Sequence, residues 1–142
     1  MKFPGIIIFA LRAVAAIILL QTLYFKFTAH PESVAIFTKL GVEPWGRLFT
    51  GAIELLAGIM LLVRRTAFYG AVVAAMLMAG AIASHLFIIG IASAGDGGQL
   101  FMLAWLVLII SLIVAYLYRH DLARYGFLPP ILRKKFFMEP KA

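Results

Sequence analysis

Residues 45–63 read WGRLFTGAIELLAGIMLLV, a run long and apolar enough to cross a lipid bilayer that nevertheless carries Glu54 near its middle. Gly51, Glu54 and Gly58 are spaced i, i+3 and i+7, so they share one face of a helix. A carboxylate at bilayer depth costs about 3 kcal/mol or more unless it is paired, and glycines let a second helix approach closely enough to supply a partner. We therefore expect this face to contact protein, with Gly51 and Gly58 as helix-packing residues.

Three further apolar runs, at 4–27, 66–92 and 100–118, accompany the one at 45–63. Hydrophobic residues make up 64% of the 142-residue chain and charged residues 13%, which is typical of integral membrane proteins. Cysteine is absent, which excludes thiolate nucleophiles and cysteine metal sites within this chain, and no metal site is expected. The sequence therefore predicts an all-α fold in which residues 1–120 form a single four-helix transmembrane domain.

The segment between the first two runs is too polar to span a bilayer. It begins with His30-Pro31-Glu32, which places proline at a favoured first helical position with an acid in the first turn. It continues to Gly41, a residue suited to ending a helix. The sequence predicts a short interfacial helix here, followed by Trp45 at the depth of the lipid headgroups.

The basic residues gather at the ends of the apolar runs, nine on one side of the predicted bundle and three on the other. The nine are Lys2, Arg64, Arg65, Arg119, Arg124, Arg133, Lys134, Lys135 and Lys141, and the three are Lys26, Lys39 and Arg47. Because cytoplasmic loops carry the excess of Lys and Arg, both termini are predicted to be cytoplasmic, with residues 121–142 forming a basic amphipathic tail on the anionic leaflet. This topology accounts for the net charge of +7, so no nucleic-acid partner is expected.

Arg12 interrupts the first run and needs an acidic partner. Ten residues separate it from Lys2 and eleven separate Glu54 from Arg65, so in antiparallel helices both side chains would lie about 15 Å from the same flanking charges. Arg12 is therefore the predicted partner of Glu54 in a buried ion pair. Such a pair is either a proton or ion site, or a structural salt bridge that fixes the register of the helices.

A second group of polar and aromatic residues falls at the opposite side of the predicted bundle. Lys26 ends the first run and His85 lies at a matching depth in the third, with Tyr24, Gln99 and Trp105 nearby. An imidazole and an ammonium group together can bind a quinone carbonyl or a small anion, and aromatic rings can stack on the ligand. The pattern predicts an outward-facing pocket between the first, third and fourth spans. In the alternative interpretation, His85 donates to a backbone carbonyl and Lys26 only anchors its helix.

Several of these features together resemble the DoxX family of small prokaryotic membrane proteins. The resemblance covers about 11–118 and rests on the order and spacing of Arg12, Lys26, the LGVEP loop, GAIELLAGIMLL and GAIASH. Arg12, Lys26, Glu54, Gly58 and His85 match family motif positions. The resemblance implies a four-helix bundle in the bacterial cytoplasmic membrane. It also implies kinship with the quinone-reducing subunit of archaeal thiosulfate:quinone oxidoreductase and with membrane partners of oxidative-stress complexes.

Three functions follow as hypotheses. The first is a redox-associated membrane subunit that binds quinone, the one candidate cofactor, or docks a soluble oxidoreductase. The second is a small transport or permeation module built on Arg12 and Glu54, and the third is a structural or assembly factor without a ligand. The isolated chain is not expected to be an enzyme by itself. Its expected partners are the lipid bilayer and either a soluble oxidoreductase or further copies of itself.

Overall fold

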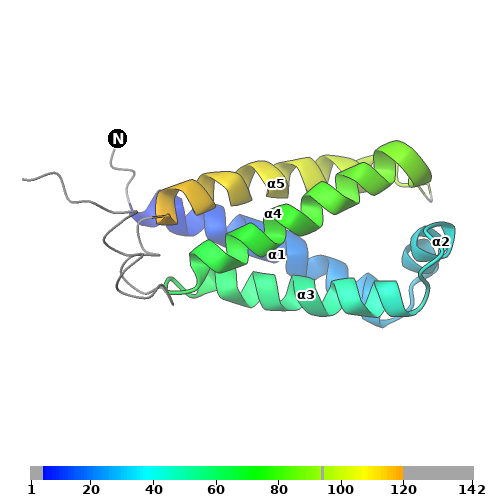
Figure 1. The fold of residues 1–142 in the computed structure, drawn as a ribbon, viewed down its shortest axis with the longest axis horizontal. Coiled ribbons are helices and arrows are strands. Elements are labelled where there is room, and N and C mark those ends of the chain that lie inside the picture. The colour runs from blue at the N-terminus through cyan, green and yellow to red at the C-terminus, as the bar shows by residue number, and fades with distance from the viewer. Residues whose placement is uncertain (1–4, 94, 120–142) are drawn as a thin grey trace, which may run out of the picture.

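The computed structural model describes residues 5–93 and 95–119 (Figure 1). Four long helices are present: α1 (Gly5–Phe27), α3 (Trp45–Leu62), α4 (Ala67–Ser84) and α5 (Gln99–Tyr118). A short helix, α2 (Pro31–Lys39), follows α1, and a π-helical turn, η1 (His85–Ile89), continues α4. These residues contain no strand, so the all-α prediction is confirmed. The predicted tail at 121–142 lies outside the described residues.

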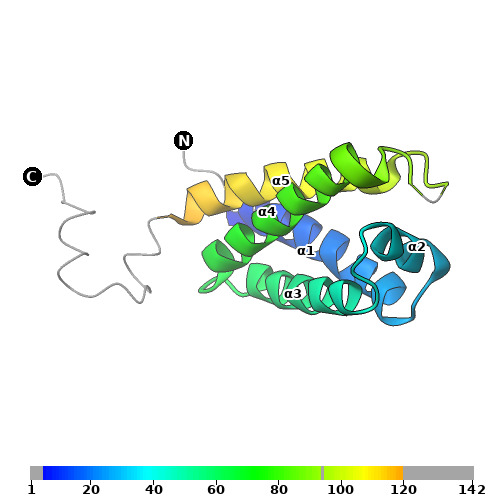
Figure 2. The ribbon, with the colours of Figure 1, turned by 45° about the vertical axis from the view of Figure 1, so that its right-hand side comes forward.

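The long helices form an elongated bundle, seen from two directions in Figures 1 and 2. α3 packs against α1 and α4, and α5 packs against α4 and α1, so the helix contacts run in a closed ring. α1 and α4 therefore occupy opposite corners of that ring. Helix α2 lies at one end of the bundle, where it contacts α1, α3 and η1. We call this the α2 end. The ring determines which candidate residues can meet.

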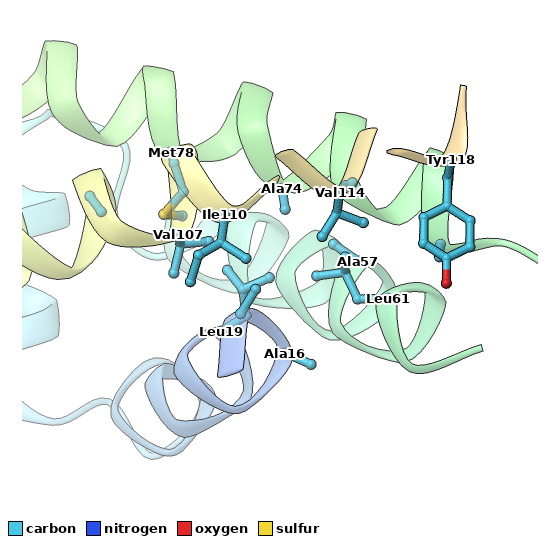
Figure 3. Packing of buried hydrophobic residues seen from close by; sticks show 14 of the residues in the cluster. Ala16, Leu19, Ala57, Leu61, Ala74, Met78, Val107, Ile110, Val114 and Tyr118 are labelled. Atoms are coloured by element: carbon cyan, nitrogen blue, oxygen red, sulfur yellow. The ribbon is translucent and has the colours of Figure 1, made fainter. Parts of the chain in front are cut away.

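The centre of the bundle is built largely from small side chains. Ala15, Ala16, Ala57, Ala71 and Ala74 are each 0% exposed. Small residues let helix backbones approach closely, which is how helices associate without a strong hydrophobic drive between them. Larger side chains, including Leu19, Leu61, Val107 and Val114, fill the remaining space (Figure 3). The core is therefore held by close packing along the full length of the helices.

The outer surface of the long helices is apolar. Large side chains such as Ile6, Phe49, Met76 and Leu112 are more than half exposed, and only 28–33% of the residues in each long span are buried inside the bundle. A soluble protein rarely exposes apolar patches of this extent. Within the part of the chain that the structure describes, four helices, counting α4 with η1, are long and apolar enough to cross a membrane. The surface is therefore suited to contact with lipid tails.

Helix α2 begins and ends at the residues that the sequence indicated. Pro31 occupies the first turn, and Gly41 follows the helix with φ +73°. The Gly41 N–H bonds the Thr38 carbonyl at 2.9 Å, and the Val42 N–H bonds the Phe37 carbonyl at 3.0 Å. These two bonds form a Schellman motif, which requires a left-handed residue at the position of Gly41. The turn brings the chain back to start α3.

The third predicted span, 66–92, ends earlier than expected. The α-helix stops at Ser84, the π-helical turn continues it to Ile89, and Gly90 then takes φ +95° and ψ 158°. Only glycine adopts this backbone region at low cost, so the helix cannot continue through it. The Gly90 N–H still bonds the His85 carbonyl at 2.9 Å, which closes the π turn. The predicted span therefore ends in the π-helical turn η1, followed by Gly90.

A matched pair of substitutions in α4 tests the close packing. A Cβ at Gly70 would lie 2.8 Å from the backbone nitrogen of Leu61 and 2.9 Å from the backbone carbon of Met60, whereas a Cβ at Gly80 would meet nothing within 4 Å. We expect Gly70→Ala to lower the free energy of unfolding by about 2 kcal/mol, because helix backbone must move to make room. Gly80→Ala should leave it unchanged or raise it by up to about 1 kcal/mol. Unfolding in mixed micelles measures both, and equal effects would contradict the contact between α3 and α4.

Candidate functional site

The buried carboxylate of Glu54 has a different partner from the one expected. Its Oε2 atom lies 2.8 Å from Lys26 Nζ and accepts a hydrogen bond from Thr22 Oγ1 at 2.8 Å. Both side chains of the ion pair are largely buried, with 13% of Lys26 and 8% of Glu54 exposed. The predicted pairing of Glu54 with Arg12 is therefore wrong. Lys26 and Thr22 lie one turn apart on α1, so one face of α1 supplies both donors to α3.

Two glycines of α3 bring this face of α1 close. A Cβ at Gly51 would lie 3.2 Å from the Phe27 ring and 3.5 Å from the Lys26 side chain. A Cβ at Gly58 would lie 3.0 Å from the Leu20 side chain. Gly51 and Gly58 therefore both lie in the contact between α3 and α1, as the sequence pattern indicated.

Arg12 caps the C-terminal end of α3. Its Nε donates to the Leu61 carbonyl at 2.6 Å, its Nη2 to the Leu62 carbonyl at 2.5 Å and its Nη1 to the Tyr118 hydroxyl at 3.0 Å. The last carbonyls of a helix have no partner within the helix, and a cation is favoured beside them. Leu61 is seven residues beyond Glu54, or about 10 Å along the axis, which places Arg12 out of reach of the carboxylate. Arg12 thus joins α1, α3 and α5.

Arg47 is a buried residue that the sequence interpretation treated only as a flanking charge. It is 5% exposed, pairs with Glu43 at 2.8 Å and donates through Nη1 to the carbonyl of Lys26. The spacing of Glu43 and Arg47, at i and i+4, is a signal for such a pair. Arg47 thereby ties the start of α3 to the last turn of α1, directly beside the pair of Lys26 and Glu54.

His85 lies at the start of η1 and is 5% exposed. Its Nδ1 atom is 2.8 Å from the carbonyl oxygen of Gly90. Because a carbonyl only accepts, Nδ1 must carry the proton in this hydrogen bond. When the imidazole is neutral, Nε2 is therefore an unprotonated acceptor, and it has no hydrogen bond to any residue that the structure describes. A histidine held in this way presents one defined atom for chemistry.

Aromatic rings extend from His85 along α5. The centroids of the His85 and Phe101 rings are 5.8 Å apart, and those of Phe101 and Trp105 are 6.4 Å apart, both in edge-to-face arrangements. Trp105 is 42% exposed, so this row of rings runs from the buried imidazole toward the surface. Phe101 was not among the predicted site residues, although its position four residues before Trp105 places it on the same helix face.

The loop before α5 holds a carboxylate close to His85. Asp96 accepts backbone hydrogen bonds at 2.9 Å from Ser93, Gly98 and Leu100. Burial raises the pKa of Asp96, but these three donors and the charge of His85 outweigh it and leave the pKa below its ordinary value. The carboxylate thus stays ionised and caps the first turn of α5.

The predicted pocket residues do not all converge. Lys26 is held by Glu54, on the corner of the helix ring opposite α4. Tyr24 is 66% exposed and packs edge-to-face on its neighbour Phe25, while Gln99 is exposed at the start of α5. The structure therefore brings His85 and Trp105 together through Phe101 and leaves Lys26 apart from them. The hydrogen bond from His85 to a backbone carbonyl agrees with the alternative interpretation of this residue.

The described residues define a class: a multi-pass helical membrane protein with buried ion pairs and a small-residue core. A model of the DoxX-like family matches residues 10–114, which include Arg12, Lys26, Glu54 and His85. The chain belongs to this family. No curated protein and no solved structure matches it.

Proposed function

We propose that this protein is a redox-associated membrane subunit that binds a quinol or quinone ring at His85. The observation that carries the proposal is the hydrogen bond between His85 Nδ1 and the Gly90 carbonyl, which leaves Nε2 as the atom for bonding a ligand. The imidazole packs edge-to-face with Phe101, which in turn packs edge-to-face with Trp105. A mostly apolar and aromatic surface with one oriented polar group is the usual composition of a small-molecule site. Membership of the DoxX-like family is consistent with this role.

The protonation of His85 decides which form of the ligand it prefers. A neutral imidazole with its proton on Nδ1 accepts a hydrogen bond from a quinol hydroxyl through Nε2. An imidazolium donates from Nε2 to a quinone carbonyl instead. Because Nε2 can act as an acceptor or as a donor, the site is suited to a ligand that gains or loses protons as it changes redox state. The binding group is therefore His85 with Phe101 and Trp105, without Lys26.

A transport role has less support. The polar cluster at Arg12 and the one at Glu54 are separated along α3 by Ala57. Ala57 belongs to one buried apolar cluster with Leu61 and with Leu19 of α1, and each of the three is 1% exposed or less. A pathway for ions or protons through the bundle would need polar groups or water in this layer. We therefore interpret both clusters as structural.

Titration with a short-chain quinol tests the proposal. We expect saturable binding to the native protein and at least about tenfold weaker binding to His85→Leu, because the one oriented polar contact is lost. Tyr24→Phe is the matched control: this side chain was a sequence candidate but is exposed away from His85, so its affinity should equal the native one. Equal affinity of the native protein and His85→Leu would refute the site.

The orientation of the protein in the bacterial cytoplasmic membrane is part of the same proposal. With both termini in the cytoplasm, the α2 end and Asp96 face outward, and the exposed Arg64 and Arg65 face the cytoplasm, where a soluble oxidoreductase could dock. Alkaline phosphatase fused after Asp96 should be active, and the same enzyme fused after Arg119 should be inactive. Activity only in the second fusion would reverse the orientation.

A further inference from the structure

We propose that Lys39 of α2 is a positioning residue that fixes the tautomer of His85. The inference rests on the proposed role of His85 as the ligand contact, and it adds a control element outside the spanning helices. In the sequence, Lys39 was interpreted only as a basic residue flanking an apolar run. In the structure it bonds the carbonyl of Ile89, the residue before Gly90, whose own carbonyl is hydrogen-bonded to His85.

Lys39 and His85 hold the same stretch of backbone. Lys39 Nζ donates to the Ile89 carbonyl at 2.8 Å, and the N–H of the same peptide unit, from Gly90, donates to the His85 carbonyl at 2.9 Å. The next carbonyl, that of Gly90, accepts from His85 Nδ1 at 2.8 Å. The Ile89–Gly90 peptide is thus hydrogen-bonded through its oxygen to Lys39 of α2 and through its N–H to the His85 carbonyl of η1. The following carbonyl, that of Gly90, accepts a hydrogen bond from the imidazole.

This backbone needs an external contact to stay in place. Gly90 has φ +95° and ψ 158°, outside any helix, so no helical ladder fixes the direction of its carbonyl. The Ile89 carbonyl lies at the end of η1, where carbonyls lack a helical partner and a cation is favoured. Lys39 supplies both the hydrogen bond and the positive charge. Without it, the Ile89–Gly90 peptide can rotate and the Gly90 carbonyl can turn away from Nδ1.

The consequence for His85 is specific. With the Gly90 carbonyl in place, the neutral imidazole keeps its proton on Nδ1 and presents a bare Nε2 to a ligand hydroxyl. With the carbonyl turned away, the proton is free to move to Nε2, which then donates rather than accepts. The position of α2 therefore sets whether the site accepts a hydrogen bond from a quinol.

Nitrogen-15 NMR of the histidine side chains, with the full chain in nanodiscs and no ligand, tests the proposal directly. The ring signals are assigned by comparison with His85→Gln. In the native protein at a pH where the imidazole is neutral, we expect Nδ1 to be protonated and Nε2 bare. In Lys39→Met, the ratio of this tautomer to the other should fall by about threefold or more, the effect of weakening one hydrogen bond. Lys39 is exposed, so the variant should fold.

Two further variants separate positioning from a general effect of α2. Lys39→Arg can still donate to the Ile89 carbonyl and should keep the native tautomer ratio. Glu32→Gln changes a charge in the first turn of the same helix and should also keep it. An unchanged ratio in Lys39→Met, or the same fall in Glu32→Gln, would overturn the proposal. If the tautomer shifts as expected but the native protein binds no quinol, positioning by Lys39 holds and the proposed function fails.

Discussion

Lys26→Met should lower the free energy of unfolding by about 3 to 5 kcal/mol, because it leaves the carboxylate of Glu54 buried without a compensating charge. In the native structure this carboxylate is 2.8 Å from Lys26 Nζ, and only the Thr22 hydroxyl would remain to stabilise it. Glu54→Leu should be costly for the corresponding reason on the lysine side. The double variant Lys26→Met with Glu54→Leu should recover most of the loss, since no unpaired charge then remains.

The double-mutant cycle identifies the partner of Glu54. We expect a coupling energy of about 2 to 3 kcal/mol between Lys26 and Glu54, measured by reversible unfolding in mixed micelles. The control cycle combines Glu54→Leu with Arg12→Met, whose effects should add within about 0.5 kcal/mol because the two residues share no contact. Additivity in the first cycle and coupling in the second would restore the pairing that the sequence alone indicated.

Arg12→Met should destabilise the bundle by about 3 kcal/mol or more. The guanidinium satisfies the carbonyls of Leu61 and Leu62 and the hydroxyl of Tyr118, and hydrogen bonds to charged groups contribute about 1.5 to 3 kcal/mol each before losses elsewhere. Arg12 and Leu61 are buried, so an acceptor that loses this donor carries the cost of an unmade hydrogen bond. The same unfolding assay measures the effect, and hydrogen exchange should show the end of α3 opening first.

Two controls locate the effect of Arg12 in the backbone carbonyls. Tyr118→Phe removes one of the three acceptors and should cost only about 1 kcal/mol. Arg12→Lys keeps the charge but replaces the planar group by a single ammonium, which cannot reach both carbonyls and the hydroxyl together, so it should recover only part of the stability. Equal costs for Arg12→Met and Tyr118→Phe would show that the carbonyl contacts contribute nothing.

The fold was largely predictable because its determinants are local. Long apolar runs predict the four long helices. Pro31 and Gly41 predict the start and the end of α2, because each residue directly constrains or permits the backbone conformation at its position. The π turn at η1 was missed because it differs from an α-helix only by a wider hydrogen bond, from the Gly90 N–H to the His85 carbonyl. No residue preference marks such a turn, and only the glycine that ends it is visible in the sequence.

The contacts within the site were less predictable because they depend on how each helix is rotated about its axis and on how far each side chain extends. Counting residues from the span ends matched the depths of Arg12 and Glu54, but it ignored the backbone carbonyls of Leu61 and Leu62, which attract the arginine. The same counting matched Lys26 with His85, but these residues lie on helices at opposite corners of the ring. The depth of a residue along an apolar helix can be predicted from the sequence. Which side chain it contacts at that depth depends on which helices pack against each other.

The central claim, that His85 presents Nε2 to a quinol or quinone, is tested most directly by comparing the affinities of the two redox forms for the native protein and for His85→Leu. A neutral imidazole with its proton on Nδ1 accepts a hydrogen bond from a quinol hydroxyl through Nε2, whereas a quinone has no hydroxyl to donate. Under anaerobic conditions at a pH where the imidazole is neutral, the native protein should bind the quinol more tightly than the quinone, and His85→Leu should lose this preference. Equal affinities of the two forms for the native protein, or the same preference in His85→Leu, would contradict the assignment of His85 as the ligand contact.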